Sequence, residues 1–144
     1  MSQSILIVDD NTGMVQLMAR MLKGVARLRF ATRGDEALKL MRESAPDLVL
    51  LDAEMPGMSG YEVCEAIRAD STLADIPVIF VTGHGETDAE VRGLEAGAVD
   101  FITKPVNEAL LLARVRTQLR LKSMSDELRS MATTDGLTGL ANRR

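Results

Sequence analysis

The sequence lacks tryptophan, and its 144 residues include only three phenylalanines, one tyrosine and one cysteine. So few aromatic rings argue against a platform on which nucleic-acid bases stack, and a net charge of −4 argues in the same direction. A single cysteine excludes an internal disulfide, so we expect a reducing, cytoplasmic location. No apolar run approaches the roughly 20 residues of a membrane helix, and the first residues show no signal-peptide pattern. We therefore expect neither nucleic acid nor a membrane as a partner.

Short apolar runs alternate with helical patterns along most of the chain. Five strands are predicted, over Ser4–Val8, Arg27–Ala31, Leu48–Leu51, Val78–Val81 and Phe101–Thr103. The apolar residues between these runs recur at helical spacing, and Ser59 and Asn107 are of the types that cap the starts of helices. Regular alternation of strand and helix indicates a parallel sheet with helices on both faces. We predict an α/β fold of the flavodoxin-like, doubly wound type, with strand order 2-1-3-4-5.

Polar side chains stand at the ends of four of these runs, where open parallel sheets bind their ligands. These side chains are Asp9, Asp10, Asp52, Thr82 and Lys104. Three carboxylates at one edge raise each other's pKa unless a cation lies between them, and their oxygen atoms suit Mg²⁺. Asp52 is central in this set and is flanked by the hydroxyl group of Thr82 and the ammonium group of Lys104. We therefore predict that Asp52 is a nucleophile that attacks phosphorus.

As a set, these residues resemble the receiver domains of two-component response regulators. The resemblance covers residues 3 to about 122 and rests on Asp9-Asp10, Asp52 with Met55-Pro56-Gly57-Met58-Ser59-Gly60, Thr82-Gly83 and Lys104-Pro105. It implies that Asp52 is the phosphoacceptor, and that a histidine kinase or a phosphotransfer protein supplies the phosphoryl group. It also implies the ligands of Mg²⁺. Asp10, Asp52 and the backbone carbonyl of Glu54 would bind the ion, and Asp9 would hold it through water.

The same resemblance assigns the residues of a switch. Lys104 would pair with the phosphoryl oxygens, and Thr82 would close onto one of them. Phe101 matches the position of the family's switch aromatic, which is often tyrosine, so a possible hydroxyl contact is missing here. His84 matches a position that borders the phosphoryl site and tunes the lifetime of the phosphate, although a lone histidine in a loop is more often an exposed side chain with no such role.

The last predicted helix runs from Asn107 to about Ala132, farther than packing on the sheet requires. The apolar residues of its first half are spaced for packing on the sheet, and these are Leu111, Leu112, Val115 and Leu119. Its second half carries a separate stripe with the 3-4-3 spacing of a coiled coil, formed by Leu121, Met124, Leu128 and Met131. We predict that this stripe is a linker through which phosphorylation promotes a homodimer. A plain amphipathic end helix is the alternative.

The segment Thr134–Arg144 resembles the opening of a GGDEF-type diguanylate cyclase domain, which typically begins Asp-x-Leu-Thr-Gly-Leu-x-Asn-Arg-Arg. The catalytic remainder of such a domain is missing from the sequence, so we expect the chain itself to be a regulatory phosphoacceptor and no enzyme. We predict a receiver over residues 1–122, a helical linker over 123–133 and the start of a cyclase domain over 134–144. In a longer protein, dimerisation would regulate the synthesis of cyclic di-GMP.

Two other functions are considered. A stand-alone receiver would dock on a partner protein when phosphorylated, but the long last helix and the tail argue against it. An aspartyl-phosphate hydrolase of the haloacid dehalogenase type would carry Asp-x-Asp-x-Thr after the first strand. The segment Asp9–Thr12 lacks that alternation, so this function ranks lowest.

Overall fold

Strands and helices alternate along the described part of the chain, as the sequence predicts. The computed structural model describes residues 3–83 and 87–135. Its elements are β1 (Ser4–Val8), α1 (Thr12–Met21), β2 (Arg27–Ala31), α2 (Gly34–Glu43), β3 (Leu48–Asp52), α3 (Gly60–Ala69), β4 (Val78–Thr82), α4 (Thr87–Glu95), β5 (Asp100–Thr103) and α5 (Glu108–Asp135). His84 and residues 136–144 lie outside the described residues, so the predictions made for them remain predictions.

The five strands form one parallel sheet with the order β2-β1-β3-β4-β5. Every residue of the three inner strands is buried, which agrees with their unbroken apolar sequences. The edge strand β2 is more exposed, as its alternation of polar and apolar residues predicts. The flavodoxin-like fold and its strand order are therefore confirmed.

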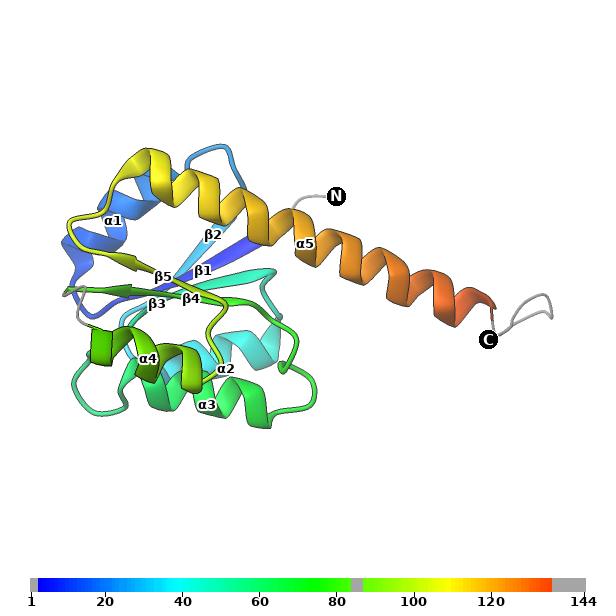
Figure 1. Cartoon of the computed structure of the whole chain (residues 1–144), viewed down its shortest axis with the longest axis horizontal. Helices are drawn as coiled ribbons and strands as arrows, with labels where there is room; N and C mark the ends of the chain where they lie inside the picture. The colour runs from blue at the N-terminus through cyan, green and yellow to red at the C-terminus, as the bar shows by residue number, and fades with distance from the viewer. Residues whose placement is uncertain (1–2, 84–86, 136–144) are drawn as a thin grey trace.

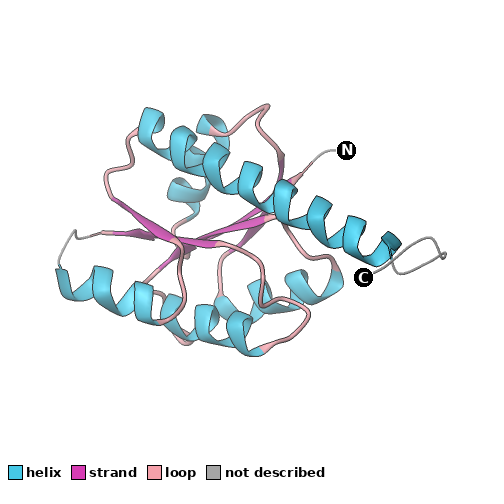
Figure 2. Cartoon of the chain, turned by 45° about the vertical axis from the view of Figure 1, so that its right-hand side comes forward, coloured by secondary structure: helices cyan, strands magenta, loops and turns pink. Residues whose placement is uncertain are grey.

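Helices cover both faces of the sheet. Helices α1 and α5 lie on one face, and α2, α3 and α4 lie on the other (Figures 1 and 2). Successive strand residues point to opposite faces, so Ile5 and Ile7 pack toward α1 and α5, whereas Leu6 and Val8 pack in the other core. Cys64 of α3 is fully buried in that second core.

The start of α3 is fixed against the end of β3. Ser59 accepts a hydrogen bond from the Glu62 amide at 3.2 Å, and the Glu62 carboxylate accepts one from the Ser59 amide at 2.9 Å, which confirms the predicted capping box. A Cβ atom on Gly60 would lie 2.0 Å from the carbonyl oxygen of Asp52. Only glycine therefore allows the helix to approach the Asp52 backbone this closely.

Helix α5 is a single element of 28 residues, about 42 Å long at 1.5 Å per residue. Asn107 caps it by accepting the Leu110 amide at 3.0 Å. The helix ends at Asp135, so the predicted end near Ala132 is three residues too early. Within the described ranges, every helix is too short or too polar to cross a membrane.

The two halves of α5 have different surroundings. Of the side chains predicted to pack on the sheet, Leu111, Val115 and Leu119 are buried, and Leu112 is partly buried against the same core. The predicted linker residues of its second half are 52–66% exposed, and these are Leu121, Met124, Leu128 and Met131. The change of face near Leu121 is thus present in the structure.

Candidate functional site

The predicted acids meet at the carboxyl ends of neighbouring strands. Asp9 follows β1, and Asp52 is the last residue of the adjacent β3. One carboxylate oxygen from each of Asp9, Asp10 and Asp52 lies within 4.8 Å of the others. Thr82 ends β4, the next strand of the sheet, and it is also buried. We call this edge of the sheet the rim.

Lys104 brings positive charge to these acids from the loop after β5. Its Nζ atom donates a hydrogen bond to Asp9 Oδ2 at 3.1 Å and lies 3.6 Å from Asp52 Oδ1. Its backbone amide donates to the carbonyl oxygen of Thr82 at 2.7 Å, which ties the loop to the end of β4. Within the described part of the chain, Lys104 is the one basic group that lies within 4.0 Å of any of these acids, and it reaches Asp9 and Asp52. Three carboxylates and one ammonium group leave an excess of negative charge.

The consequence is visible at Asp52, which is only 6% exposed. Burial, together with the negative charge of Asp9, raises the pKa of Asp52 to about 7, although the nearby charge of Lys104 acts to lower it. The amide of Glu54 donates to Asp52 Oδ1 at 3.3 Å and also favours the ionised form. At neutral pH the free site therefore holds Asp52 close to the midpoint of its titration.

The donor set fits a hard divalent cation. Mg²⁺ prefers carboxylate and carbonyl oxygens and usually retains several waters. The three clustered carboxylates supply such oxygens, and their uncompensated charge is what a cation would neutralise. The backbone of Glu54 lies beside the same cluster through its amide contact with Asp52. The role of its carbonyl as a ligand remains a prediction.

A small cavity of about 10 Å³ adjoins Thr82 on the side of α4 and β5. Residues that line it include Ala53, Tyr61, Phe80, Thr82, Leu94 and Phe101. This volume is at the lower limit for one water molecule, so the partly buried ring of Phe101 cannot enter the cavity unless a neighbour moves. Phe101 and Thr82 thus line the same cavity.

Sequence reasoning missed the aromatic wall of this cavity. The rings of Tyr61 and Phe80 are 5.2 Å apart, and the guanidinium of Arg92 lies 4.1 Å from the centre of the Tyr61 ring. The signal available was that Tyr61 directly follows Gly60, at the point where α3 approaches Asp52. The linker residues of α5 are not part of the rim, because the helix leaves the domain at the opposite end of the sheet (Figure 1).

Comparisons with known proteins agree with this geometry. A family model described as the response regulator receiver domain matches residues 5–116. Response regulator PleD of Caulobacter vibrioides is 41% identical over 130 residues, which are 90% of this chain and 29% of PleD. DNA-binding response regulator MtrA of Mycobacterium tuberculosis is 43% identical over 122 residues, which are 83% of this chain and 52% of MtrA.

A solved structure shares the same fold. The crystal structure of a signal receiver domain from Vibrio parahaemolyticus matches with a TM-score of 0.83 at 29% identity, covering 89% of this chain and 98% of that one. The chain spans less than a third of PleD and about half of MtrA, so both relatives are considerably longer proteins.

Proposed function

Because the chain belongs to the family of response regulator receiver domains, which are phosphorylation-controlled switches, we propose that Asp52 is its phosphoacceptor. The observation that carries this proposal is the position of Asp52. It is buried at the end of β3, within a cluster of three acids and 3.6 Å from the ammonium group of Lys104. A histidine kinase or a phosphotransfer protein would supply the phosphoryl group.

The transfer places specific demands on Asp52 and Lys104. One carboxylate oxygen of Asp52 forms a new P–O bond while the bond between phosphorus and the donor breaks, so Asp52 has to be ionised. Lys104 is placed to neutralise charge on the transferring oxygens. Asp10, Asp52 and the Glu54 carbonyl would hold Mg²⁺ directly, and Asp9 through water. The ion, when bound, supplies the positive charge that the clustered carboxylates lack.

Thr82 and Phe101 would carry the response to phosphorylation. A phosphoryl group adds about two negative charges and three strong hydrogen-bond acceptors. The Thr82 hydroxyl stands at the end of the strand next to β3, so we expect it to close onto one of these oxygens. That movement would open the cavity shared with Phe101, and the ring would then shift inward. The surface formed by α4 and β5 would change as a result.

The output proposed for the longer protein is a diguanylate cyclase. Support comes from the dense match of residues 134–144 to the start of a GGDEF domain, which would follow the receiver (1–122) and the linker (123–133). MtrA is named as DNA-binding, so a receiver domain by itself does not define the output, and the tail carries this part of the proposal. Two such domains would have to meet to join two GTP molecules into cyclic di-GMP.

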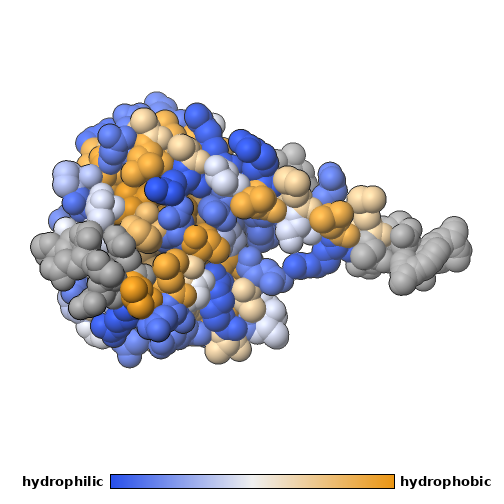
Figure 3. Space-filling view, viewed as in Figure 1, coloured by the Kyte–Doolittle hydropathy of each residue, from blue (hydrophilic) through white to orange (hydrophobic). Residues whose placement is uncertain are grey.

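The exposed stripe of α5 provides the means of bringing two copies together. Orange, apolar side chains follow α5 beyond the body of the domain (Figure 3). Pairing of two helices would bury these side chains, with about 1.5–3 kcal/mol for each one that is fully buried, before the cost of association. Two heptads are short for a stable coiled coil, so the receiver surface has to contribute, which makes the association dependent on phosphorylation.

Labelling with a small phosphodonor tests the central assignment. Acetyl phosphate with Mg²⁺ should phosphorylate the wild-type chain and the Asp35→Asn variant equally, because Asp35 is an exposed acid of α2 that pairs with Arg33. The Asp52→Asn variant should remain unlabelled. Equal labelling of all three proteins would refute the assignment of Asp52.

A further inference from the structure

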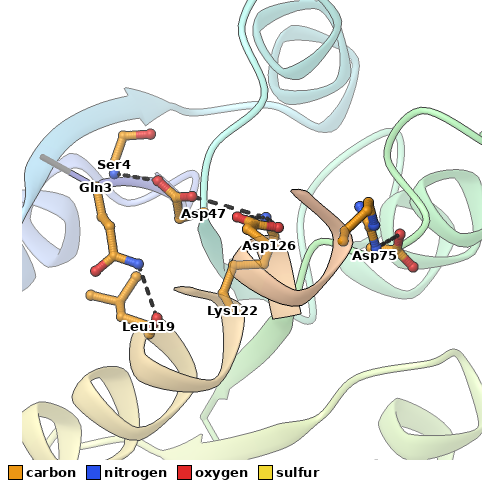
Figure 4. Close-up of polar contacts among 8 residues, drawn as sticks. Gln3, Ser4, Asp47, Asp75, Leu119, Lys122 and Asp126 are labelled. Carbon is orange, nitrogen blue, oxygen red and sulfur yellow. Dashed lines mark hydrogen bonds and ion pairs between the residues drawn. The ribbon is translucent and has the colours of Figure 1, made fainter. Parts of the chain in front are cut away.

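The end of the sheet opposite the rim, which we call the base, holds the linker part of α5 through ion pairs (Figure 4). Arg129 Nη2 lies 2.6 Å from Asp75 Oδ2. Lys122 Nζ lies 4.0 Å from Asp47 Oδ1 and also donates to Asp126 of the same helix at 2.7 Å. These contacts join α5 to two loops, one directly before β3 and one before β4.

Lys122 and Arg129 share one face of the helix, because seven residues make about two turns. At about 100° per residue, that face points roughly 130° away from the centre of the apolar stripe. The structure agrees, since the stripe residues Leu121, Met124, Leu128 and Met131 are more than half exposed while the two basic residues reach the base. The receiver therefore holds one side of the helix and leaves the apolar side open.

The two aspartates of the base belong to the strands that carry the site. Asp47 directly precedes β3, which ends at Asp52. Asp75 lies in the segment that leads into β4, which ends at Thr82. A five-residue strand spans about 17 Å, so each inner strand has a rim residue at one end and a helix contact at the other.

Both aspartates are held firmly on the receiver. Asp47 Oδ2 accepts the Ser4 amide at 2.9 Å, which fixes it to the start of β1. The segment around Asp75 is braced by Arg68 of α3, which donates to the carbonyl oxygens of Ala74 at 3.1 Å and Ile76 at 2.7 Å. Arg68 also donates to the carbonyl oxygen of Gly97, in the turn between α4 and β5, at 2.9 Å.

We propose that the pairs Asp47–Lys122 and Asp75–Arg129 form a latch that sets the direction of the linker helix relative to β3 and β4. Two attachment points seven residues apart fix the tilt of the helix, which one contact does not do. Because the latch uses the side opposite the stripe, a second copy of the chain can pair with the stripe while the latch stays closed. The role of the second copy rests on the dimer proposed above, whereas the latch itself is a contact within one chain.

The two pairs differ in exposure. Lys122 has a side chain only 14% exposed, whereas Asp75 and Arg129 are 65% and 58% exposed. Exposed pairs are weak and sensitive to salt, so the Asp75–Arg129 pair is the part of the latch that substitution and salt should open. Asp47 also supports β1, which makes it a poor site for a test.

Spin-label distance measurements on the unphosphorylated 144-residue chain test the latch. One label at Lys39→Cys on α2 and one at Glu127→Cys on the linker report the direction of the helix, because both side chains are exposed and belong to neither pair. The buried Cys64 should stay unlabelled. An excess of unlabelled chain restricts the signal to distances within one molecule.

We expect a narrow distance distribution in the otherwise wild-type chain. Arg129→Glu should make the distribution roughly twice as broad, because repulsion replaces the ion pair. The exchange of charges in the double variant Asp75→Lys with Arg129→Glu should narrow it again. Arg120→Glu is the matched control, since Arg120 lies on the same helix and has no ion pair with a described residue. Salt of about 1 M should broaden the wild-type distribution toward that of Arg129→Glu.

The proposal is overturned if Arg129→Glu gives the same distribution as Arg120→Glu, or if the double variant stays as broad as the single one. Far-UV circular dichroism of each variant checks that the helix itself is retained. Sedimentation of the same proteins with beryllofluoride tests dimerisation separately. A closed latch without a dimer would refute the proposed output and leave the latch standing. A dimer with a broad distribution in every protein would refute the latch alone.

Discussion

The acidic residues at the two ends of the sheet differ in how much positive charge lies near them. At the rim, carboxylate oxygens of Asp9, Asp10 and Asp52 lie within 4.8 Å of one another, and Asp9 and Asp52 share the ammonium group of Lys104. At the base, Asp47 and Asp75 each face a basic residue of their own on α5. The aspartates of the rim therefore outnumber the basic groups near them, whereas each aspartate of the base has a basic partner.

The pKa of Asp52 reflects the crowding at the rim. At the rim, burial and the charge of Asp9 raise the pKa of Asp52 to about 7. Away from the rim, at the end of α3, hydrogen bonds from Thr72 and the contact with Arg42 lower the pKa of Asp70. Crowded, buried acids reduce the stability of a fold, so their presence indicates chemistry. Acids that each pair with a basic residue indicate a role in holding one element of the structure against another.

The largest effect should follow from the loss of one rim acid. Asp10→Ala removes a carboxylate from the predicted Mg²⁺ site, so labelling by acetyl phosphate with Mg²⁺ should fall by at least about a hundredfold. Wild type in EDTA should lose labelling to a similar degree. Asp75→Asn removes an acid of the base and should leave labelling within about twofold of wild type. Normal labelling of Asp10→Ala, or of wild type in EDTA, would contradict the role of the rim.

The pH dependence of stability should also report the crowding of acids at the rim. A carboxyl group with a raised pKa binds its proton more tightly in the folded chain than in the unfolded one. The stability that Asp52 contributes is therefore complete below its ordinary pKa of 3.8 and is lost as the pH rises through about 7.

Asp52→Asn removes this titration. Between about pH 4 and pH 8, the free energy of unfolding of wild type should fall by up to about 4 kcal/mol relative to the variant, because the pKa of Asp52 rises from 3.8 to about 7 and one pKa unit corresponds to about 1.4 kcal/mol. Urea denaturation in EDTA measures the difference. Asp35→Asn is the control with the opposite sign, because Arg33 lowers the pKa of Asp35. Parallel pH profiles for wild type and Asp52→Asn would show that the crowding at the rim does not affect stability.

Beyond the base, the exposed side of α5 should determine dimer affinity. Met124→Glu with Leu128→Glu places like charges along the stripe and should weaken the beryllofluoride-dependent dimer at least about tenfold, with phosphorylation of Asp52 unchanged. Ser123→Glu is the control, because Ser123 lies about 120° around the helix from the centre of the stripe, and it should have little effect. Sedimentation velocity with and without beryllofluoride provides the measurement. Equal dimer affinity in the double variant and wild type would exclude the stripe as the interface.

The smallest chemical change is at Thr82. Thr82→Ala should still accept phosphate, within a few-fold of wild type, because Asp52 and the acids around it are untouched. The gain in dimer affinity with beryllofluoride should disappear, since the variant has no hydroxyl to close onto the phosphoryl group. A variant that dimerises as wild type does would show that Thr82 is not the relay.

The rim was predictable from sequence because topology places it. Asp52 ends an apolar run, Asp9 and Asp10 follow another, and parallel strands bring their carboxyl ends to one edge. The sequence predicted the place of Lys104 in the same way. Its 3.1 Å contact with Asp9 depends on side-chain torsions that no pattern records.

The base was not predictable by the same reasoning. Asp75 and Arg129 are 54 residues apart, one in a loop and one on a helix, and no periodic pattern links them. The end of α5 was placed too early because the apolar stripe stops at Met131. The helix itself continues to Asp135, and no glycine or proline interrupts the sequence between Pro105 and Gly136.

The most direct test of the difference between rim and base is to locate the phosphoryl group itself. Borohydride reduction of the acetyl-phosphate-treated chain converts an aspartyl phosphate to homoserine, and mass spectrometry of the peptides then identifies the residue. The result expected here is conversion at Asp52 alone, with none at Asp47 or Asp75. Conversion at any other aspartate, with Asp52 intact, would contradict the assignment of the rim as the phosphorylation site.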